Sequence, residues 1–479
     1  MNTGTMLEAA ATGDPARIAL IIDGRSISYG ELARMVRRCA EGLTAHGVVA
    51  GQRVAVVDVG SLLSIATVLG SARIGAAAAL MNPALTPPEI QGLLKNSGCA
   101  EVAVAGGPFV HRVREAGAAT VLTETDFVDG LGARGAPDDA TADRDALILF
   151  TSGTTGLPKA VAIGGEQLAK RIKGMAAPFR AEAKPSVGMM CVPFFHVGGA
   201  LGTLGSLYSG NTSVVQQRFD AGEWLRLVSA HRVTATFVVP TMLQRILDHP
   251  DFAGTDLSSL VAIAYGAAAA PVSLVRRAMA ALPRVAFANV FGQTETLGAY
   301  TTLMPDDHRD PARAGSVGRP LPGVDVRVVD PDTGNDVEVG TIGELWVNSN
   351  QNVPAGWLRT GDLARRDSDG YLFPSGRLSD TINRGGEKFG PIEVEEALRS
   401  HAAVRDVAVA GIADEEFGQR VGAAVVACAP VTLDELRSHC RELIAYFKLP
   451  ERLAIVDEIP YNSAGKVNRR ELAALILDS

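Results

Sequence analysis

Strand-like and helix-like patterns alternate along the first 130 residues. Short apolar runs at 18–22 and 53–59 predict strands, and the longer stretches 29–46 and 62–74 predict helices. In 29–46 the apolar residues recur every three or four positions and the charged residues lie largely elsewhere, which is typical of an amphipathic helix packed on a core. Alternation of this kind favours a parallel sheet wrapped by helices, so we expect an α/β fold.

Composition bounds the size of the protein and the kinds of partner it can have. The 479 residues are 47% hydrophobic, which is enough to build large cores and to divide into more than one domain. The net charge of −8 and a pI near 5.6 give no electrostatic reason to expect binding to nucleic acid or to an anionic membrane surface. We therefore expect no nucleic-acid partner.

Cysteine usage and apolar stretches bear on the compartment. The five cysteines are odd in number, widely spaced and without metal-ligand pairing, so reduced thiols in a cytosol are the simplest account. The apolar stretch 62–81 contains Arg73 and is interrupted by Gly70 and Gly75, which favours a core helix and a following strand over a membrane span. The N-terminus shows no basic region followed by an apolar core, so no signal peptide is expected. A cytoplasmic protein is the prediction.

A loop rich in glycine and hydroxyl side chains follows the strand-like run 146–150. Glycines let backbone N–H groups approach phosphate oxygens, threonine and serine hydroxyls add donors, and Lys159 supplies a compact positive charge. A Walker A loop would place Ser or Thr after Gly-Lys, whereas Pro158 precedes this lysine and Ala160 follows it. Residues 151–159 therefore predict a phosphate-binding loop of another type, with a flexible polar turn as the alternative.

The residues Thr-Ser-Gly-Thr-Thr-Gly-Leu-Pro-Lys at 151–159 resemble the phosphate loop of the adenylate-forming superfamily, which contains acyl- and aryl-CoA synthetases, stand-alone adenylation domains and luciferases. Other motifs that resemble those of the superfamily follow in the expected order along nearly the whole chain. The resemblance implies that this loop binds ATP. The loop residues assigned to ATP are Thr151, Ser152, Gly153, Thr154, Thr155, Gly156 and Lys159.

A histidine lies among aromatic and small residues at 193–199, Pro-Phe-Phe-His-Val-Gly-Gly. A lone histidine on an apolar segment is more often a satisfied core residue than a functional one. This segment, however, resembles a superfamily motif whose histidine lies between the acyl pocket and the thiol tunnel, which makes His196 a catalytic candidate. Amino-acid-activating members usually carry an aspartate here to pair the substrate ammonium. Because this segment has none, we do not expect an α-amino acid substrate.

The small residues of 264–271 stand between a strand-like run and a helix that begins near Val272. By resemblance, Gly266, Ala267 and Ala268 would line the space shared by the adenine and acyl groups, where missing side chains make room for flat rings. The alternative is a tight turn that packs a helix on a strand.

The residues Asn-Val-Phe-Gly-Gln-Thr-Glu-Thr at 289–296 resemble a motif that supplies an aromatic ring for adenine, a threonine for phosphate and a glutamate for magnesium. Tyrosine is commoner where this chain has Phe291, so stacking survives but a phenolic hydrogen bond does not. Glu295 offers the hard oxygen ligands that Mg²⁺ prefers, although a glutamate in a loop is normally just solvated. The residues assigned here are Phe291, Gly292 and Thr294 for ATP, and Glu295 with Thr151 for the metal.

The region 340–380 carries further resemblances. Asp362 would accept hydrogen bonds from both ribose hydroxyls, although Thr-Gly-Asp is also good turn chemistry. The segment between Val347 and Trp357 is far shorter than in most family members, which suggests a trimmed surface element. By resemblance Arg377 contacts ribose, and Ser379 stands at the hinge on which the C-terminal domain swings, where aspartate or lysine is commoner. A hinge needs permissive backbone angles rather than one side chain, so we expect rotation to persist.

Two motifs lie in the last hundred residues. The segment 382–395 resembles a loop that faces the active site during thioester formation, in which Gly385 and Gly386 would let a pantetheine arm pass close to the backbone. The segment 460–469 resembles the terminal lysine motif. A surface lysine is usually idle, but Lys466 comes last in a complete and ordered series, so we assign it a catalytic role in adenylation.

The resemblance implies an α/β protein with a large N-terminal domain of parallel-type sheets wrapped by helices, residues 1–377, and a small mobile α+β lid domain, residues 378–479. The implied activity is that of an ATP-dependent carboxylate–CoA ligase with ATP, Mg²⁺ and CoA, acting in two steps through an acyl-AMP. We expect a neutral aromatic or medium-chain acid, because the residues assigned to the acyl pocket are small, apolar or uncharged. They are His196, Val197, Gly198, Gly266, Leu297 and Gly298.

Two other functions are weighed against this one. An adenylating enzyme could pass the acyl group to the phosphopantetheine of a carrier protein or to an amine, because no basic cluster stands out as a 3′-phosphate site for CoA. A regulator that binds nucleotide without catalysis is disfavoured, since Thr154, Glu295, Asp362 and Lys466 are all present. The sequence leaves the particular acid and a possible homodimer open.

Overall fold

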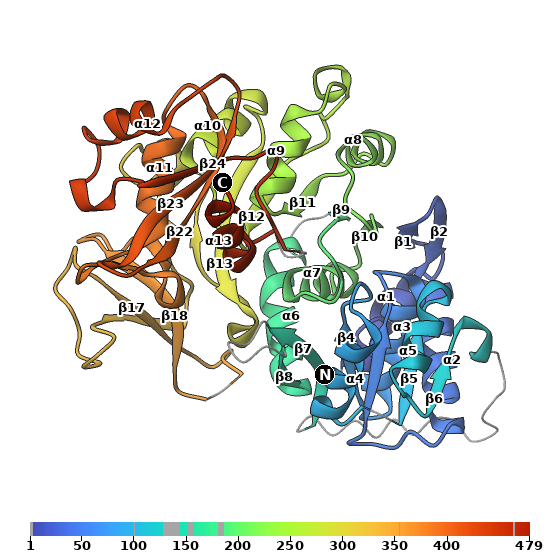
Figure 1. Ribbon diagram of the computed structural model, residues 1–479. Coiled ribbons are helices and arrows are strands. Elements are labelled where there is room, and N and C mark those ends of the chain that lie inside the picture. The colour runs from blue at the N-terminus through green and yellow to red at the C-terminus, as the bar shows by residue number, and fades with distance from the viewer. Residues whose placement is uncertain are drawn as a thin grey trace.

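The computed structural model describes residues 3–99, 101–127, 144–151, 158–180, 186–353, 355–462 and 465–479. Within these ranges the strands form four sheets, and helices pack on the six-stranded, the nine-stranded and the C-terminal sheet (Figure 1). No helix in the described ranges is both long enough and apolar enough to cross a membrane. All five cysteines are free thiols, as the sequence predicted.

Most of the strands in the first 165 residues belong to a six-stranded sheet. Its strands are parallel except for the last, which pairs antiparallel with its neighbour. Successive residues of one strand, such as Val56 and Val57, point to opposite faces of the sheet and are buried in different hydrophobic clusters. The sheet order is β6 (Thr120–Leu122), β5 (Val102–Ala105), β3 (Arg53–Val57), β4 (Ala77–Met81), β7 (Asp145–Thr151) and β8 (Lys159–Gly164).

A nine-stranded sheet packs against the first through a shared layer of helices. Its order is β15 (Arg319–Pro320), β14 (Gly298–Leu303), β13 (Ala286–Gln293), β12 (Ala262–Gly266), β11 (Ala235–Val238), β9 (Val187–Met190), β10 (Thr212–Val215), β1 (Ile18–Ile22) and β2 (Arg25–Ser28). The prediction of a parallel sheet for residues 17 to 130 was wrong for β1, and the sequence did not predict β2 as a strand. These two strands form an antiparallel pair, and β1 joins the second sheet because it pairs with β10.

The helices that cover the two large sheets form three layers, and each layer packs into a different hydrophobic cluster. The shared layer contains α2 (Tyr29–Ala45), α3 (Leu62–Arg73), α6 (Gly165–Arg180) and α7 (Val197–Tyr208). The outer layers are α4 (Pro87–Ser97) with α5 (Val110–Glu115) on the six-stranded sheet, and α8 (Ala221–Ala230), α9 (Pro240–Asp248) and α10 (Val272–Ala281) on the nine-stranded one. A short helix, α1 (Glu8–Gly13), precedes them. The apolar stretch 62–81 is confirmed as a core helix and strand, α3 and β4.

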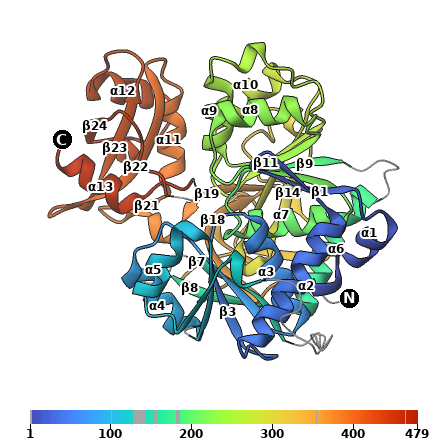
Figure 2. The same ribbon diagram turned by 90° about the vertical axis from the view of Figure 1, so that its right-hand side faces the viewer.

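Two smaller sheets complete the chain. The four-stranded sheet is β16 (Val324–Val329), β17 (Ile342–Ser349), β18 (Trp357–Arg366) and β19 (Leu372–Arg377). The last sheet contains β20 (Ile382–Arg384), β21 (Glu387–Phe389), β22 (Val404–Asp414), β23 (Gly418–Ala427) and β24 (Arg452–Ile455). Its helices are α11 (Pro391–Arg399), α12 (Leu433–Cys440) and α13 (Arg469–Leu477). Figure 2 shows these C-terminal elements, coloured orange to red, as a separate lobe beside the rest of the molecule.

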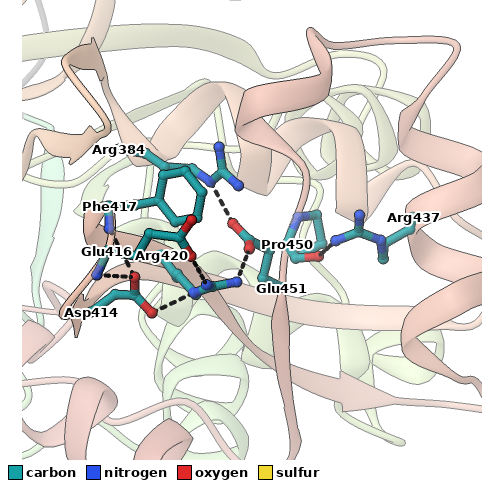
Figure 3. A network of polar contacts seen from close by, with 8 residues as sticks. All are labelled: Arg384, Asp414, Glu416, Phe417, Arg420, Arg437, Pro450 and Glu451. Carbon is teal, nitrogen blue, oxygen red and sulfur yellow. Dashed lines mark hydrogen bonds and ion pairs between the residues drawn. The ribbon is translucent and has the colours of Figure 1, made fainter.

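A network of arginines and carboxylates ties the C-terminal lobe together (Figure 3). The Glu451 carboxylate accepts hydrogen bonds from Arg384 of β20 and from Arg420 of β23, the latter at 2.7 Å. Arg420 also pairs with Asp414 at the end of β22, and Arg437 of α12 donates to the carbonyl of Pro450 at 2.6 Å. The network thereby joins separate segments of the lobe around one glutamate.

We expect Glu451→Gln to loosen the C-terminal lobe, because it leaves two half-buried guanidinium groups without a carboxylate between them. The local free energy of unfolding should fall by about 2 kcal/mol, between the values typical of exposed and of buried ion pairs. The measurement is hydrogen–deuterium exchange of the β23 amides in the full chain. Glu415→Gln, on the exposed turn of the same lobe, is the control. Equal exchange in wild type and Glu451→Gln would contradict the role of this network.

Candidate active site

Side chains from both lobes come within electrostatic reach of one another. The ammonium group of Lys466, from the C-terminal lobe, is influenced by Arg377, Asp362 and Glu295, and it influences His196 in turn. These residues were singled out in five separate stretches of sequence. The fold therefore brings together a lysine, a carboxylate–arginine pair, a second carboxylate and a histidine.

Asp362 and Arg377 form an ion pair across adjacent strands. They are register partners on β18 and β19, and the Arg377 Nε atom lies 2.9 Å from Asp362 Oδ1. Burial raises the pKa of Asp362, while Arg377 and then Lys466 oppose that shift. Because the ion pair involves Oδ1, the second carboxylate oxygen can accept a hydrogen bond from a ligand.

Glu295 and Thr151 meet although 144 residues separate them in sequence. The Thr151 hydroxyl, at the end of β7, donates to Glu295 Oε1 at 3.2 Å. Both side chains offer the hard oxygen atoms that Mg²⁺ prefers. No group of three or more His, Cys, Asp and Glu side chains in the described ranges is arranged to hold a metal. The pair therefore fits Mg²⁺ that takes its other ligands from a phosphate chain and water, as is usual for this ion.

Lys466 is positioned by a local turn and by packing between the lobes. Its backbone N–H donates to Asn462 Oδ1 at 3.1 Å, and its carbonyl accepts from the Asn462 N–H at 2.9 Å. The preceding Gly465 has φ +72°, and a Cβ atom there would lie 2.9 Å from the side chain of Val239, just before α9. Solvent still reaches the lysine side chain, yet loss of hydration lowers the pKa of Lys466, and Arg377 adds to that shift.

His196 precedes the first turn of α7, with its ring 4.6 Å from that of Phe195. Its Nε2 atom is buried and has no hydrogen-bond partner among the described residues. Burial and then the charge of Lys466 lower the pKa of His196 from 6.5 to about 4. The imidazole is therefore neutral at physiological pH, and its orphaned nitrogen distinguishes it from a satisfied core histidine.

Two small residues of the second sheet, Gly266 and Gly292, lie where neighbouring strands approach closely. Gly266 is the last residue of β12, and a Cβ atom there would lie 2.0 Å from the carbonyl oxygen of Val290 on β13. Gly292 is equally tight, because its Cβ atom would lie 2.0 Å from the carbonyl of Gly298. Ala267, next after Gly266, adopts the left-handed φ of +68°. For Gly266 the close approach of two strands thus accounts for the glycine by itself.

Phe291 packs edge-on against Tyr300 of β14, with ring centroids 5.4 Å apart. The Tyr300 hydroxyl is buried and has no partner among the described residues. Burial, and then the Asp362 carboxylate, raise the pKa of Tyr300. A phenol group is therefore present beside the Asp362–Arg377 pair, although the sequence motif has phenylalanine at 291. The sequence did not indicate Tyr300, since one tyrosine in a strand gives no signal of its own.

The predicted hinge and thiol-tunnel residues lie on exposed backbone. Ser379 is in the 3₁₀ turn Leu378–Asp380, and its hydroxyl donates to Asp380 at 2.9 Å. Gly385 and Gly386 form the turn between β20 and β21 with φ of +60° and +96°. Their backbone N–H groups donate to Phe417 and Asn383, both in the C-terminal lobe. These contacts place neither glycine against the other predicted site residues.

The remaining residues predicted for the site lie in several other elements or outside the described residues. Ser152, Gly153, Thr154, Thr155 and Gly156 lie outside the described residues. Lys159 starts β8 opposite Thr151, with an exposed side chain. Thr294 belongs to the 3₁₀ turn Thr294–Thr296, after which Leu297 and Gly298 adopt φ of +50° and +87°. Val197 and Gly198 begin α7, and Ala268 is half-buried after Ala267.

Two polar residues of α6 were also missed. Arg171 is buried, and its guanidinium contacts the backbone at Leu297 and Ala299. Gln167 donates to backbone carbonyls of the segment that joins β17 to β18. A signal was present in the sequence, because Arg171 follows Leu168 by three positions and would lie on the apolar side of a helix here, although no helix was predicted for this stretch.

Comparison with known proteins gives matches along nearly the whole chain. The model of the AMP-binding enzyme family matches residues 7–356, and that of the AMP-binding enzyme C-terminal domain matches residues 393–466. An indoleacetate–CoA ligase from Aromatoleum aromaticum is 31% identical, over 99% of this chain and 98% of its own length. A fatty acid–[acyl-carrier-protein] ligase from Streptomyces coeruleorubidus is 30% identical, over 96% of this chain and 94% of its own. The structure of an amide bond synthetase from Marinactinospora thermotolerans superposes with a TM-score of 0.87 at 27% identity, covering 98% of this chain and 99% of that one.

The pKa of about 4 for His196 predicts that its ring stays neutral in the folded protein until the pH falls well below 6. An unfolded chain takes up this proton near pH 6.5, whereas the folded chain does so only near pH 4. This histidine therefore makes the folded state less stable as pH falls from about 6.5 to about 4. NMR titration of the ring resonances measures the pKa directly. Removing the lysine charge by Lys466→Met should raise it, whereas Lys448→Met in the C-terminal lobe should not. Titration of the wild-type ring near 6.5 would contradict the burial of its charge.

Proposed function

This chain belongs to the AMP-binding enzyme family, and from that premise we propose that it is a carboxylate–CoA ligase acting in two steps. The family activates carboxylates with ATP, as the sequence predicted, and the chain has the matching α/β fold with a smaller C-terminal domain. We place the domain boundary at Arg377, with residues 1–377 and 378–479 as the two parts. A cytoplasmic location and a homodimer stay predictions.

The observation that carries the proposal is the convergence of Lys466 with Asp362, Arg377 and Glu295. In the first step a carboxylate oxygen attacks the α-phosphorus of ATP, the bond to the β-phosphate oxygen breaks, and pyrophosphate leaves. Negative charge grows on the phosphate oxygens, and the Lys466 ammonium is placed to offset it. Mg²⁺ held by Glu295 and Thr151 supplies further positive charge when it is bound. Asp362 and Arg377 hold the ribose, so that the α-phosphate is oriented toward the carboxylate.

The second step needs a different arrangement of the two domains. We propose that the C-terminal domain turns about Ser379, so that Lys466 leaves and the Gly385–Gly386 turn takes its place. The thiol sulfur then attacks the acyl carbonyl carbon and loses its proton to solvent, and AMP leaves with the oxygen that had joined it to the acyl group. The exposed glycine turn suits this task, because it has no side chain to block a pantetheine arm.

For the substrate we propose a neutral aromatic or medium-chain acid. The residues assigned to the acyl group carry no fixed charge, and His196 is neutral. Arg171 is the buried cation of α6 closest to this region, and three of its N–H groups are used by protein acceptors. Two relatives are named for an aromatic acid, indoleacetate, and for a fatty acid, which supports this class of substrate.

A carrier protein or an amine is the alternative acceptor. It is favoured by the relative that is named for an acyl-carrier protein and by the structural neighbour that is named for amide bonds. Mass spectrometry of reactions with Mg·ATP and a panel of aryl, fatty and dicarboxylic acids, run with and without CoA, separates the two. Acyl-CoA with AMP supports the ligase. Acyl-AMP that accumulates despite CoA supports the carrier or amine acceptor, and no adenylate from any acid opposes both.

Replacing the terminal lysine should separate the two half-reactions. We expect Lys466→Ala to slow adenylation by about 100-fold or more, because one preorganised cation is lost where charge develops. Thioester formation from supplied acyl-AMP should stay near the wild-type rate. Pyrophosphate release measures the first step and acyl-CoA formation the second, with Lys448→Ala as control. Equal loss of both steps would count against the role assigned to Lys466.

The ribose assignment is tested at Asp362. We expect Asp362→Ala to weaken ATP binding by about 10- to 100-fold, as loss of charge-assisted hydrogen bonds should. Isothermal titration calorimetry with a non-hydrolysable ATP analogue gives the affinity. Asp325→Ala, on the exposed edge strand β16, is the matched control. Unchanged affinity in Asp362→Ala would refute the assignment.

A further inference from the structure

The short segment between β17 and β18 is fastened to helix α6. The side-chain amide of Gln167 donates to the backbone carbonyls of Gln351, at 3.1 Å, and of Asn352, at 2.5 Å. Arg171 Nη1 donates to Gln351 Oε1 at 2.9 Å. Gln167 and Arg171 are four residues apart and so lie on the same face of the helix. Together they form a clamp on this segment, which we call the Gln167–Arg171 clamp.

The same guanidinium also holds the segment assigned to the acyl group. Arg171 Nε donates to the carbonyl of Leu297 at 2.9 Å, and Nη2 donates to that of Ala299 at 3.0 Å. Only 8% of Arg171 is exposed, and its three hydrogen-bond acceptors are neutral oxygens. A buried cation is costly unless its N–H groups are hydrogen-bonded. The planar guanidinium group therefore fixes both the segment at Gln351 and the segment at 297–299 relative to α6.

The position of Val353 is fixed by the clamp on the two residues before it and by a hydrogen bond of its own. Its backbone N–H donates to the carbonyl of Glu295 at 2.7 Å, which ties it to the candidate metal residue. Its half-buried side chain packs against the hydrophobic cluster that contains Leu297 and Leu201. Val197, another residue assigned to the acyl group, packs against the same cluster.

The absence of a side chain at Gly298 leaves space in this region. A Cβ atom at Gly298 would lie 3.6 Å from Arg171 Nη2 and 3.7 Å from Leu201 Cδ1, which is ordinary contact distance. The space beside Gly298 is therefore bounded by the clamp and by α7. Val353 is tied to Glu295, three residues before Gly298, and a residue fixed beside a substrate site limits what can enter that site.

We propose that Val353, held in place by the Gln167–Arg171 clamp, is a specificity-determining residue that limits the size of the acyl group. The proposal rests on the proposed function, since it assigns a wall to the acyl site of that reaction. Residues 351–353 then act as a fixed boundary of the substrate site, and Arg171 is a positioning residue that acts through Val353.

The test is the selectivity of Val353 variants over acids of graded size. For Val353→Ala we expect the ratio of kcat/KM for a larger to a smaller straight-chain acid to rise about tenfold or more, and for Val353→Phe to fall by a similar factor. Pyrophosphate release gives kcat/KM for each acid, and the KM for ATP should stay within about twofold of wild type. Unchanged ratios in an active Val353→Ala enzyme would overturn the proposal. Failure of the wild type to adenylate every acid would instead overturn the proposed function.

The clamp is tested separately with Arg171→Lys, which keeps the charge but loses the planar fork. We expect this variant to broaden selectivity in the same direction as Val353→Ala, and the double variant to add little. A purely structural role would lower the thermal stability and leave the ratio unchanged. Lys170→Gln, whose lysine pairs with Glu166 on the exposed face of the same helix, is the matched control. If Arg171→Lys does not fold, the Val353 variants still decide the proposal.

Discussion

The meeting of opposite charges from the two lobes is the constraint on which the candidate site depends. Asp362 is buried, which raises its pKa, and Lys466 loses hydration, which lowers its pKa. Each shift favours the neutral form of its own group, and each group favours the charged form of the other. The ion pair with Arg377 adds a fixed positive charge beside the carboxylate. Because Lys466 comes from the C-terminal lobe, this balance exists only while that lobe is docked as observed.

Close approach of strands sets the shape around these charges. The strands β12, β13 and β14 approach so closely that Gly266 and Gly292 admit no Cβ atom. The left-handed turn at Leu297 and Gly298 then directs the chain back along the sheet, and Arg171 caps the carbonyls that this turn leaves free. Small residues that look like a ligand-binding motif therefore also serve packing, and Gly266 is explained by packing alone.

The short segment before β18 shows how a trimmed loop gains a defined position. Its length leaves little backbone to pair with itself, and its carbonyls are instead satisfied by Gln167 of α6. Asn352 is buried and donates to the carbonyls of Val347 and Gly356, which closes the segment from within. The loop is thus fastened between Glu295 and helix α6, although Asn350, Ala355 and Gly356 stay exposed to solvent.

The sequence by itself determined the family, the order of the motifs and the alternation that gives the α/β fold, because these depend on residue type and local spacing. It also identified Lys466, Asp362, Arg377, Glu295 and His196 as candidates. Tertiary structure alone decided that β1 leaves the first sheet for the second, and that Tyr300 and Arg171 join the site. It also brought Thr151 and Glu295, which the sequence had already assigned to one metal site, into hydrogen-bond contact across 144 residues. Such contacts depend on how distant segments pack together. They also depend on which buried polar groups still need a hydrogen-bond partner. Neither can be predicted from a local pattern of residues.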